Sequence, residues 1–357
     1  MSTQLFIIGL SFLVCLVLAA VLFTLLAKAS FLNENLLSAV IAVCGTIILG
    51  ILPLSCFFWS SYDFVSSITV WQYFTPFFGS LLILAALFLR RPAVTAAAVL
   101  LASFISVFAG GMNIEFLPQM PLLVNQLLTV AALWLFALSW KGVAALNPLP
   151  QITGITICGG LLLLFAFSLT PLVLGISAAG LLAALIIAYI YSSAQPVNTD
   201  NIPFLGFVFG WFGLICAQEY LLPCFIIFAM FCLLEFCLCL FRKITLQPQY
   251  RELPYNSAAV QSFNDGLPAD TLLHIIWSTE VLLLIFGLLQ VNSENSFSIP
   301  SFAAVIVAWQ MYRISHWRLA SQTLKETNSA LISEIKQGFG RFFSSGTDDK
   351  NDKTDKS

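Results

Sequence analysis

Long runs of apolar residues follow one another along almost the whole chain, and they restrict the fold more than any other feature. The first run, from Leu5 to Ala27, has about 23 residues, which is too long for the apolar core of a signal peptide and long enough to cross a bilayer. Only helices and closed barrels cross a bilayer, because every backbone polar group must be hydrogen-bonded within the protein. Runs this long and continuous predict helices rather than the short alternating strands of a barrel.

Eleven segments of this kind are predicted, each close to the roughly 20 residues that a spanning helix needs. They cover residues 5–27, 36–59, 68–89, 92–109, 121–139, 152–168, 171–192, 203–218, 221–241, 271–290 and 298–315. The predicted fold class is therefore all-α: a polytopic integral membrane protein with about 11 transmembrane helices.

The composition excludes the main alternatives to a membrane protein. Hydrophobic residues make up 59% of the chain and charged residues 9%, against roughly 45–50% and 25% in soluble domains. The net charge of −2 provides no field that would attract a polyanion. A soluble globular domain, a disordered chain and a nucleic-acid partner are therefore not expected, and the lipid bilayer is the expected surrounding.

The charged residues between the predicted helices indicate the orientation. All the basic residues before position 316 fall in odd-numbered loops or at the end of the last helix, whereas the even-numbered loops carry only acidic ones. The basic residues are Lys28, Arg90, Arg91, Lys141, Arg242, Lys243, Arg251 and Arg313. The acidic ones are Asp63, Glu115, Glu219 and Glu294. By the positive-inside rule, the N-terminus is predicted outside and the C-terminus in the cytoplasm.

Three regions of different character are predicted along the chain. Residues 1–315 form the transmembrane helical domain. Residues 316–343 mix apolar and charged side chains at spacings of three, four and seven, which predicts an amphipathic cytoplasmic helix that lies on the inner leaflet or packs against the bundle. Residues 344–357 are polar and charged, which predicts a disordered tail.

The nine cysteines all fall inside apolar runs, and none forms a CxxC pair. Zinc sites require a ligand spacing that is missing here. We interpret the cysteines as small hydrophobic residues, and no metal site is expected from them.

Three ionisable residues lie within predicted helices: Glu235, Glu280 and His274. An ionisable group in a membrane costs roughly 2.5–3.5 kcal/mol on insertion scales, so each position warrants a functional hypothesis. The alternative is a protonated or hydrogen-bonded side chain packed between helices.

Basic residues gather at the predicted cytoplasmic ends of the helices: Arg90, Arg91, Lys141, Arg242 and Lys243. Such clusters bind anionic lipid headgroups or phosphates. The alternative is that these residues only set the orientation of the helices.

Five stretches in the region 75–290 carry a family resemblance. They are "LLILAALFLRRPAVTAAAVLLASFISVFAGGMNIEFLP" (81–118), "LLTVAALWLFALSW" (127–140), "AALIIAYIYSSAQPVNTDNIPFLGFVFGWFGL" (183–214), "EFCLCLFRK" (235–243) and "NDGLPADTLLHIIW" (264–277). In this order they resemble the polyprenyl-phosphate N-acetylhexosamine-1-phosphate transferases, the family of undecaprenyl-phosphate GlcNAc-1-phosphate transferase and phospho-MurNAc-pentapeptide translocase (glycosyltransferase 4 type). The resemblance implies a bacterial inner-membrane protein. It also implies a site in which Mg²⁺, held by carboxylates, orients a nucleotide sugar for attack by a polyprenyl phosphate.

The acidic and histidine motifs of that family are missing. The turn expected to hold paired aspartates reads Phe88-Leu89-Arg90-Arg91-Pro92, and Glu115 is the only acid between Asp63 and Asp200. In the loop after the fifth helix, Asn147 matches either the family's asparagine or one of its aspartates. Asp200 is the one candidate catalytic acid that survives, and residues 244–270 contain no histidine.

We therefore expect a degenerate, inactive relative of these transferases, a pseudoenzyme with no cofactor. It would bind an anionic polyprenyl lipid or lipid-linked sugar, or support an active transferase in cell-envelope polysaccharide assembly. The expected phosphate-binding residues are Arg90, Arg91, Lys141, Asn147, Arg242 and Lys243, because guanidinium groups can hold a phosphate without a metal.

Two alternatives stay open. The first is an active, Mg²⁺-dependent enzyme that transfers a UDP-sugar phosphate to undecaprenyl phosphate. Its site would be built on Asp200, Glu252, Asp265 or Asp270. The second is a transporter with a polar path through Glu235, Glu280 and His274.

Overall fold

The fold was analysed in a computed structural model. The model describes residues 2–28, 70–89, 91–116, 119–143, 146–192, 195–196, 203–245, 257–293 and 298–316. The predicted second helix (36–59), the tail and almost all of the predicted amphipathic helix lie outside these residues, as do Arg90, Asp200 and Glu252.

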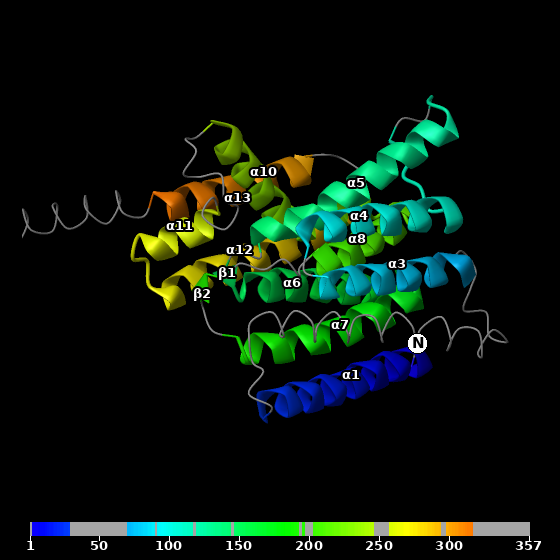
Figure 1. Ribbon diagram of the computed structural model, residues 1–357, viewed down its shortest axis with the longest axis horizontal. Helices are drawn as coiled ribbons and strands as arrows, with labels where there is room; N and C mark the ends of the chain where they lie inside the picture. The colour runs from blue at the N-terminus through cyan, green and yellow to red at the C-terminus, as the bar shows by residue number, and fades with distance from the viewer. Residues whose placement is uncertain are drawn as a thin grey trace, which may run out of the picture.

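Helices dominate the described part of the chain (Figure 1). They are α1 (Ser2–Lys28), α3 (Val70–Phe88), α4 (Pro92–Phe104) with the π-helical turn η1 (Ile105–Ala109), α5 (Leu122–Val143), α6 (Leu149–Ala166), α7 (Leu172–Ile190), α8 (Pro203–Gln218), α9 (Leu222–Phe228), α10 (Met230–Thr245), α11 (Ala258–Asn264), α12 (Ala269–Gln290) and α13 (Ser298–Ser315). Two short strands, β1 (Leu146–Asn147) and β2 (Gln195–Pro196), pair antiparallel.

The helices confirm a membrane protein of the all-α class. Among the described residues, five are long and apolar enough to cross a bilayer, and the bent pair α9–α10 would make a sixth. Three shorter apolar helices lie at 7–22, 74–87 and 203–218. These helices occupy segments where the hydropathy of the sequence predicts spans.

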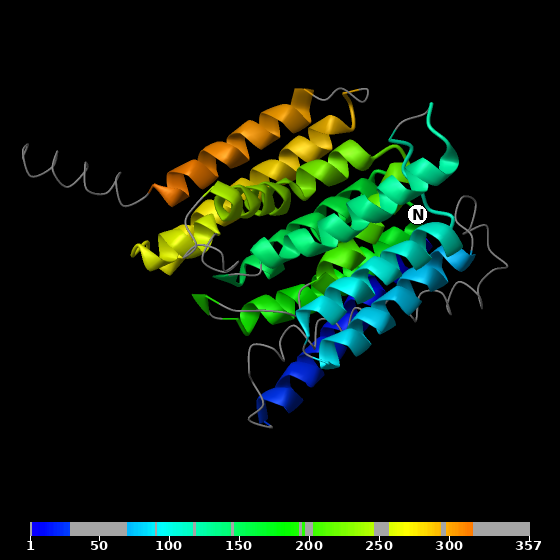
Figure 2. The ribbon, with the colours of Figure 1, turned by 45° about the horizontal axis from the view of Figure 1, so that its top comes forward.

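Successive long helices run in opposite directions through one bundle (Figure 2). α1 packs against α7, α7 against α6, and α5 lies between α4, α8 and α10, while α12 contacts α6, α9 and α13. We call the end of the bundle that holds β1, β2 and α11 the strand end, and the opposite end the loop end. α5 and α10 both run toward the strand end (Figures 1 and 2).

The centre of the bundle is formed by α6, α7 and α8. Every residue of α8 from Pro203 to Cys216 is buried, as expected for a helix that is apolar all round. Its glycines allow close approach: a Cβ added at Gly206 would lie 2.6 Å from the carbonyl oxygen of Ala137 in α5. The central helix is therefore held by backbone contact as well as by side chains.

The predicted ninth span is not one straight helix. It breaks at Ala229 into α9 and α10, whose axes differ by 65°. The ring of Phe228, just before the break, fills the space beside two glycines, since a Cβ added at Gly160 or Gly287 would lie 2.7 or 2.1 Å from it. We infer that this wedge between α6 and α12 fixes the end of α9, and that the chain then leaves the bundle axis as α10.

Three small elements at the strand end were not predicted. Strands β1 and β2 join the loops after α5 and α7, with Leu146 opposite Pro196 and Asn147 opposite Gln195. The short helix α11 begins at Ser257, whose hydroxyl accepts a hydrogen bond from the backbone N–H of Val260. These elements are too short to produce a hydrophobic period in the sequence.

Candidate functional site

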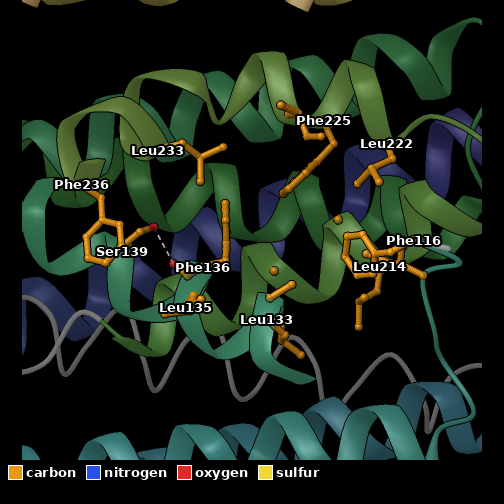
Figure 3. A pocket seen from close by; sticks show the side chains of 15 residues that line it. Phe116, Leu133, Leu135, Phe136, Ser139, Leu214, Leu222, Phe225, Leu233 and Phe236 are labelled. Atoms are coloured by element: carbon orange, nitrogen blue, oxygen red, sulfur yellow. Dashed lines mark hydrogen bonds between the residues drawn. The ribbon is translucent and has the colours of Figure 1, made fainter. Parts of the chain in front are cut away.

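An apolar groove lies between α5, α8 and the bent pair α9–α10 (Figure 3). Its volume is about 260 Å³, and its lining runs from Phe116 near the loop end to Ser139 and Phe236. On α5 the lining residues are spaced as one stripe of a helix. They are Ala132, Leu133, Leu135, Phe136 and Ser139.

The groove lies where the bent pair turns away from a straight course. Gly210 and Gly213 of α8 line it, but the Leu133 and Phe225 side chains already fill the space beside them, since a Cβ added at either glycine would lie 2.3 or 2.7 Å from these side chains. The 65° bend at Ala229 directs α10 away from the line of α9. We therefore attribute the open space to the bend.

The loop end of the groove is closed by the segment after α4. This helix passes into the π-helical turn η1 and stops at Gly110, where a Cβ would meet the carbonyl oxygen of Ser106 at 2.3 Å. The following chain is attached to α5, because the backbone N–H of Ile114 donates to Oγ1 of Thr129 at 3.0 Å. Ile114 and Phe116 are thereby held as part of the groove wall.

The chemistry of the groove suits an apolar chain. Ser139 is the only polar side chain in the lining, and its hydroxyl donates to the carbonyl oxygen of Phe136 at 2.6 Å (Figure 3). Leu135 is 49% exposed and Phe116 44% exposed, so the groove is bordered by surface that faces lipid. Pockets for drug-sized ligands measure roughly 300–1,000 Å³, so this groove has room for only part of a long apolar chain.

Basic positions continue from the groove toward the strand end. Lys141 follows Ser139 by two residues in α5, and Arg242 and Lys243 lie in the last two turns of α10. α5 and α10 pack against each other, so the two helices that border the groove also carry these basic residues. Arg242 is half-buried and interacts electrostatically with Glu235.

Arg91 lies at the start of another helix. It is the N-cap residue of α4 and is exposed. α4 packs on α5, and the indole N–H of Trp134 in α5 donates to the carbonyl oxygen of Ala96 at 3.1 Å. Arg91 therefore stands at the strand end on a helix that neighbours the groove, and it is not part of the groove lining.

Glu235 is fully buried and joins α10 to α11. One carboxylate oxygen, Oε1, accepts a hydrogen bond from the hydroxyl of Ser257 and another from the backbone N–H of Ala258 at 2.7 Å. Its second oxygen, Oε2, has no hydrogen-bond partner among the described residues. The carboxylate thus satisfies the free backbone donor at the start of α11, a group that needs an acceptor in a buried helix end.

Glu280 is also fully buried, and it joins α12 to α6. Its Oε1 accepts a hydrogen bond from the hydroxyl of Thr153 at 2.8 Å, and Thr156, one turn further along α6, adjoins the same carboxyl group. Within the described residues its Oε2 has no partner. Thr153 and Thr156 are the polar residues that make this position tolerable inside the bundle.

The two buried glutamates share an electrostatic neighbour, Cys232. This cysteine is buried, interacts electrostatically with both carboxyl groups, and has its sulfur 3.3 Å from the hydroxyl oxygen of Ser139. Cys232 and Ser139 thus form a polar region at the groove floor within electrostatic range of both glutamates. His274 is exposed on α12 and is not part of this region.

The other predicted site residues lie at the strand end. Asn147 is in β1, and its Oδ1 accepts a hydrogen bond from the side-chain amide of Gln151 at 3.1 Å. Asp265 is the C-cap residue of α11, and Asp270 lies in the first turn of α12. Both aspartates are exposed. Among the described residues no three His, Cys, Asp or Glu side chains lie close enough together to hold a metal ion.

Sequence reasoning did not identify the groove residues or the partners of the two glutamates. Apolar lining residues have the same composition as core and lipid-facing residues, so no local signal separates them. Thr153 and Thr156 were detectable only as hydroxyl residues one turn apart in an apolar helix. Ser257 was detectable as a residue type that favours helix N-caps.

Comparison with known proteins finds no relative of this chain. No family model matches the chain, and no curated protein and no solved structure is significantly similar to it.

Proposed function

We propose that this protein binds an anionic polyprenyl lipid, with the isoprenoid chain in the groove beside α5 and the phosphate at the basic positions of the strand end. In this proposal it is a catalytically degenerate relative of the polyprenyl-phosphate sugar-1-phosphate transferases. It has about eleven spans, its N-terminus is outside, and it resides in a bacterial inner membrane. The observation that carries the proposal is the groove itself, which is apolar, borders the lipid and lies between the two helices that carry Lys141 and Arg242.

The shape of the groove supports a long, flexible and apolar ligand. Its wall is built of side chains such as Phe136, Phe225 and Phe236, and it extends along α5. An apolar chain that enters this space removes those surfaces from lipid contact without exposing any polar group. A ligand with several polar groups would leave them unpaired there, because Ser139 already donates to the backbone.

The basic residues near the strand end support the binding of an anionic headgroup there. Each lysine or arginine near an anionic membrane surface contributes about 1 kcal/mol, and three such residues follow the groove along α5 and α10. The replacement of the family's acidic turn by Arg90 and Arg91 adds two more cations in the loop before α4. A phosphate would then be held by cations directly, and the binding would not require Mg²⁺.

The proposal includes a role beside an active enzyme. A bound polyprenyl phosphate or lipid-linked sugar is the substrate of envelope polysaccharide assembly, so a binder of this kind would supply or retain the lipid for a transferase. The two acidic clusters that the resemblance places in the inner loops are missing from the sequence between Asp63 and Asp200, and this loss is why we propose binding rather than catalysis.

The test is a pair of tryptophan substitutions in α5. Ala132 lines the groove and Ala131, its neighbour, is exposed outside the lining. Ala132→Trp should fill the groove and weaken the binding of undecaprenyl phosphate by about 10-fold or more, which corresponds to roughly 1.4 kcal/mol. Ala131→Trp should leave the affinity unchanged. Binding is measured on protein in nanodiscs by native mass spectrometry and by the rise in melting temperature with added lipid.

Three outcomes distinguish the alternatives. Binding that is lost in Ala132→Trp and is indifferent to Mg²⁺ supports the proposal. Binding that requires Mg²⁺ favours the active transferase and leads to an assay of UDP-sugar transfer. Equal binding by both tryptophan variants, or no binding by the unmodified protein, contradicts the groove as the lipid site.

A further inference from the structure

One helix wall of the groove is attached to the rest of the protein in an unusual way. α10 contributes Leu233 and Phe236 to the lining. It begins directly after the break at Ala229, so its orientation is not set by continuity with α9. The position of this wall therefore depends on the contacts that α10 makes along its own length.

The polar contacts that α10 makes with neighbouring helices include the following two, in addition to its packing against α5 and α13. The first joins Cys232 to Ser139 of α5 at 3.3 Å. A thiol is a weak hydrogen-bonding group, so this contact contributes little. The second joins Glu235 to Ser257 and Ala258 at the start of α11. A carboxylate that accepts two hydrogen bonds away from water is a strong contact.

Glu235 lies where its hydrogen bonds can set the position of the groove wall that α10 forms. It immediately precedes Phe236 and lies two residues after Leu233, while its side chain is directed to α11 rather than into the groove. The groups that face it are the hydroxyl of Ser257 and the backbones of Ala258 and Ala259 from the start of α11, and Cys232, Cys239 and Arg242 from α10 itself.

We infer that Glu235 is a positioning residue for the lipid groove: its hydrogen bonds to Ser257 and Ala258 hold α10 at the distance from α5 that leaves the groove open. This inference rests on the proposed function and deepens it, because it couples the lipid groove to the cytoplasmic-side connection between α10 and α11. A ligand or partner that moves the start of α11 would then change how tightly the groove holds its lipid.

The alternative is that Glu235 only stabilises the fold. The two roles are separable, because a purely structural residue changes the melting temperature without changing the geometry of the wall. A readout on Phe236 itself is therefore needed. A trifluoromethyl-phenylalanine placed at position 236 reports the surroundings of this ring by ¹⁹F NMR, and it can be recorded in nanodiscs on the full chain.

Three variants grade the loss of the contact. Glu235→Gln keeps an oxygen that can accept both hydrogen bonds but removes the charge that strengthens them. Ser257→Ala removes one of the two donors, and Glu235→Leu removes the acceptor of both bonds. We expect the ¹⁹F signal to shift in all three, and the dissociation rate of undecaprenyl phosphate to rise by about 3-fold in the first two and about 10-fold in the third, the range typical of coupling mutations. Ser257→Ala and Glu235→Gln keep the test valid where Glu235→Leu does not fold.

Glu280→Gln is the matched control. It alters a second, equally buried glutamate whose hydrogen bond goes to Thr153 of α6, a residue outside the groove lining. It should lower the melting temperature while leaving the ¹⁹F signal at position 236 and the lipid dissociation rate unchanged.

The outcomes separate this inference from the proposed function. Unchanged ¹⁹F signals and dissociation rates in folded Glu235→Gln and Ser257→Ala proteins, with binding still lost in Ala132→Trp, would overturn the role of Glu235 and keep the groove. A protein that binds no lipid at all would overturn the proposed function, and the ¹⁹F signals of the unliganded variants would still decide whether Glu235 positions the wall.

Discussion

Two adjacent faces of α5 have the same apolar composition and opposite packing. The face with Ala137 and Trp140 is sealed against α8, where Gly206 meets the backbone of Ala137 and the Trp140 ring stacks on Phe209 with centroids 4.8 Å apart. The face with Ala132 and Leu135 borders an open groove. The difference shows that the neighbour, and not the residues of α5, decides whether an apolar face becomes core or binding surface.

The neighbours differ in how they lie along α5. α8 packs on it, and its Gly206 lets the two backbones meet. The bent pair meets α5 in two parts: Phe225 of α9 is tilted against Phe136 at 5.8 Å, and α10, whose axis turns by 65° from that of α9 after Ala229, packs on α5 as a separate helix. Substitutions on the two faces should therefore lower the free energy of unfolding by different amounts.

The largest effect is expected on the sealed face. In Gly206→Ala the new Cβ would lie 2.6 Å from the carbonyl oxygen and 2.7 Å from the Cα of Ala137, and backbone cannot move aside as a side chain can. We expect the free energy of unfolding in micelles to fall by about 3 kcal/mol. Gly159→Ala is the control, because nothing lies within 4 Å of its new Cβ, and it should raise stability by up to about 1 kcal/mol. Equal stabilities of the two variants would mean that the α5–α8 contact is looser than described.

A smaller effect is expected at the border of the groove. In Gly213→Ala the new Cβ would lie 2.7 Å from Cε1 of Phe225, a ring that lines the cavity and can shift into it. The cost in unfolding free energy should therefore stay below about 1 kcal/mol, while the affinity for undecaprenyl phosphate falls because the ring occupies the groove. A loss of stability as large as that of Gly206→Ala would contradict an open cavity at this position.

The smallest effect is expected at the groove floor. Ser139→Ala removes a hydroxyl whose best acceptor, the carbonyl oxygen of Phe136, also belongs to the helix, and whose contact with Cys232 is weak. The unfolding free energy should change by about 0.5 kcal/mol or less. A loss above this range, measured in the same micelles, would show that the link between α5 and α10 is stronger than a thiol contact and that Glu235 shares its role with Ser139.

Much of the helical framework could be predicted from local sequence. The span predicted at 171–192 is α7, Leu172–Ile190, and the span predicted at 271–290 is α12, Ala269–Gln290. Such predictions succeed because the length and hydropathy of a segment are properties of that segment alone. Pro92 stands in the first turn of α4, where a proline is well tolerated.

The break in the predicted ninth span could not be found in the same way. Residues 221–241 read as one continuous apolar run. The ring of Phe228 ends α9 by packing at Gly160 and Gly287, which lie in helices about 60 residues away on either side along the chain. Only the assembled bundle brings these glycines to the same place.

For the candidate site, the sequence identified the two acids whose insertion into a membrane is energetically unfavourable. It did not identify the residues that hydrogen-bond to them. Glu235 and Glu280 stood out because acids are rare in apolar segments. Their hydrogen bonds to Ser257 and Thr153 cross between helices, and hydroxyl residues are common enough that nothing marked these two. His274 looked equivalent to the acids in the sequence, but it is exposed on its helix, because helical position decides which face a residue occupies.

The sequence by itself determined that this chain is a helical membrane protein, and it determined where most of its helices lie, because insertion into lipid depends on the apolar character of each segment. It also determined that Glu115 is the only acidic residue between Asp63 and Asp200. Only the tertiary structure decided that α10 turns by 65° from the axis of α9 and that Glu235 is tied to α11. A groove is the space left by helices that do not meet, and that space depends on packing between distant segments rather than on any one of them.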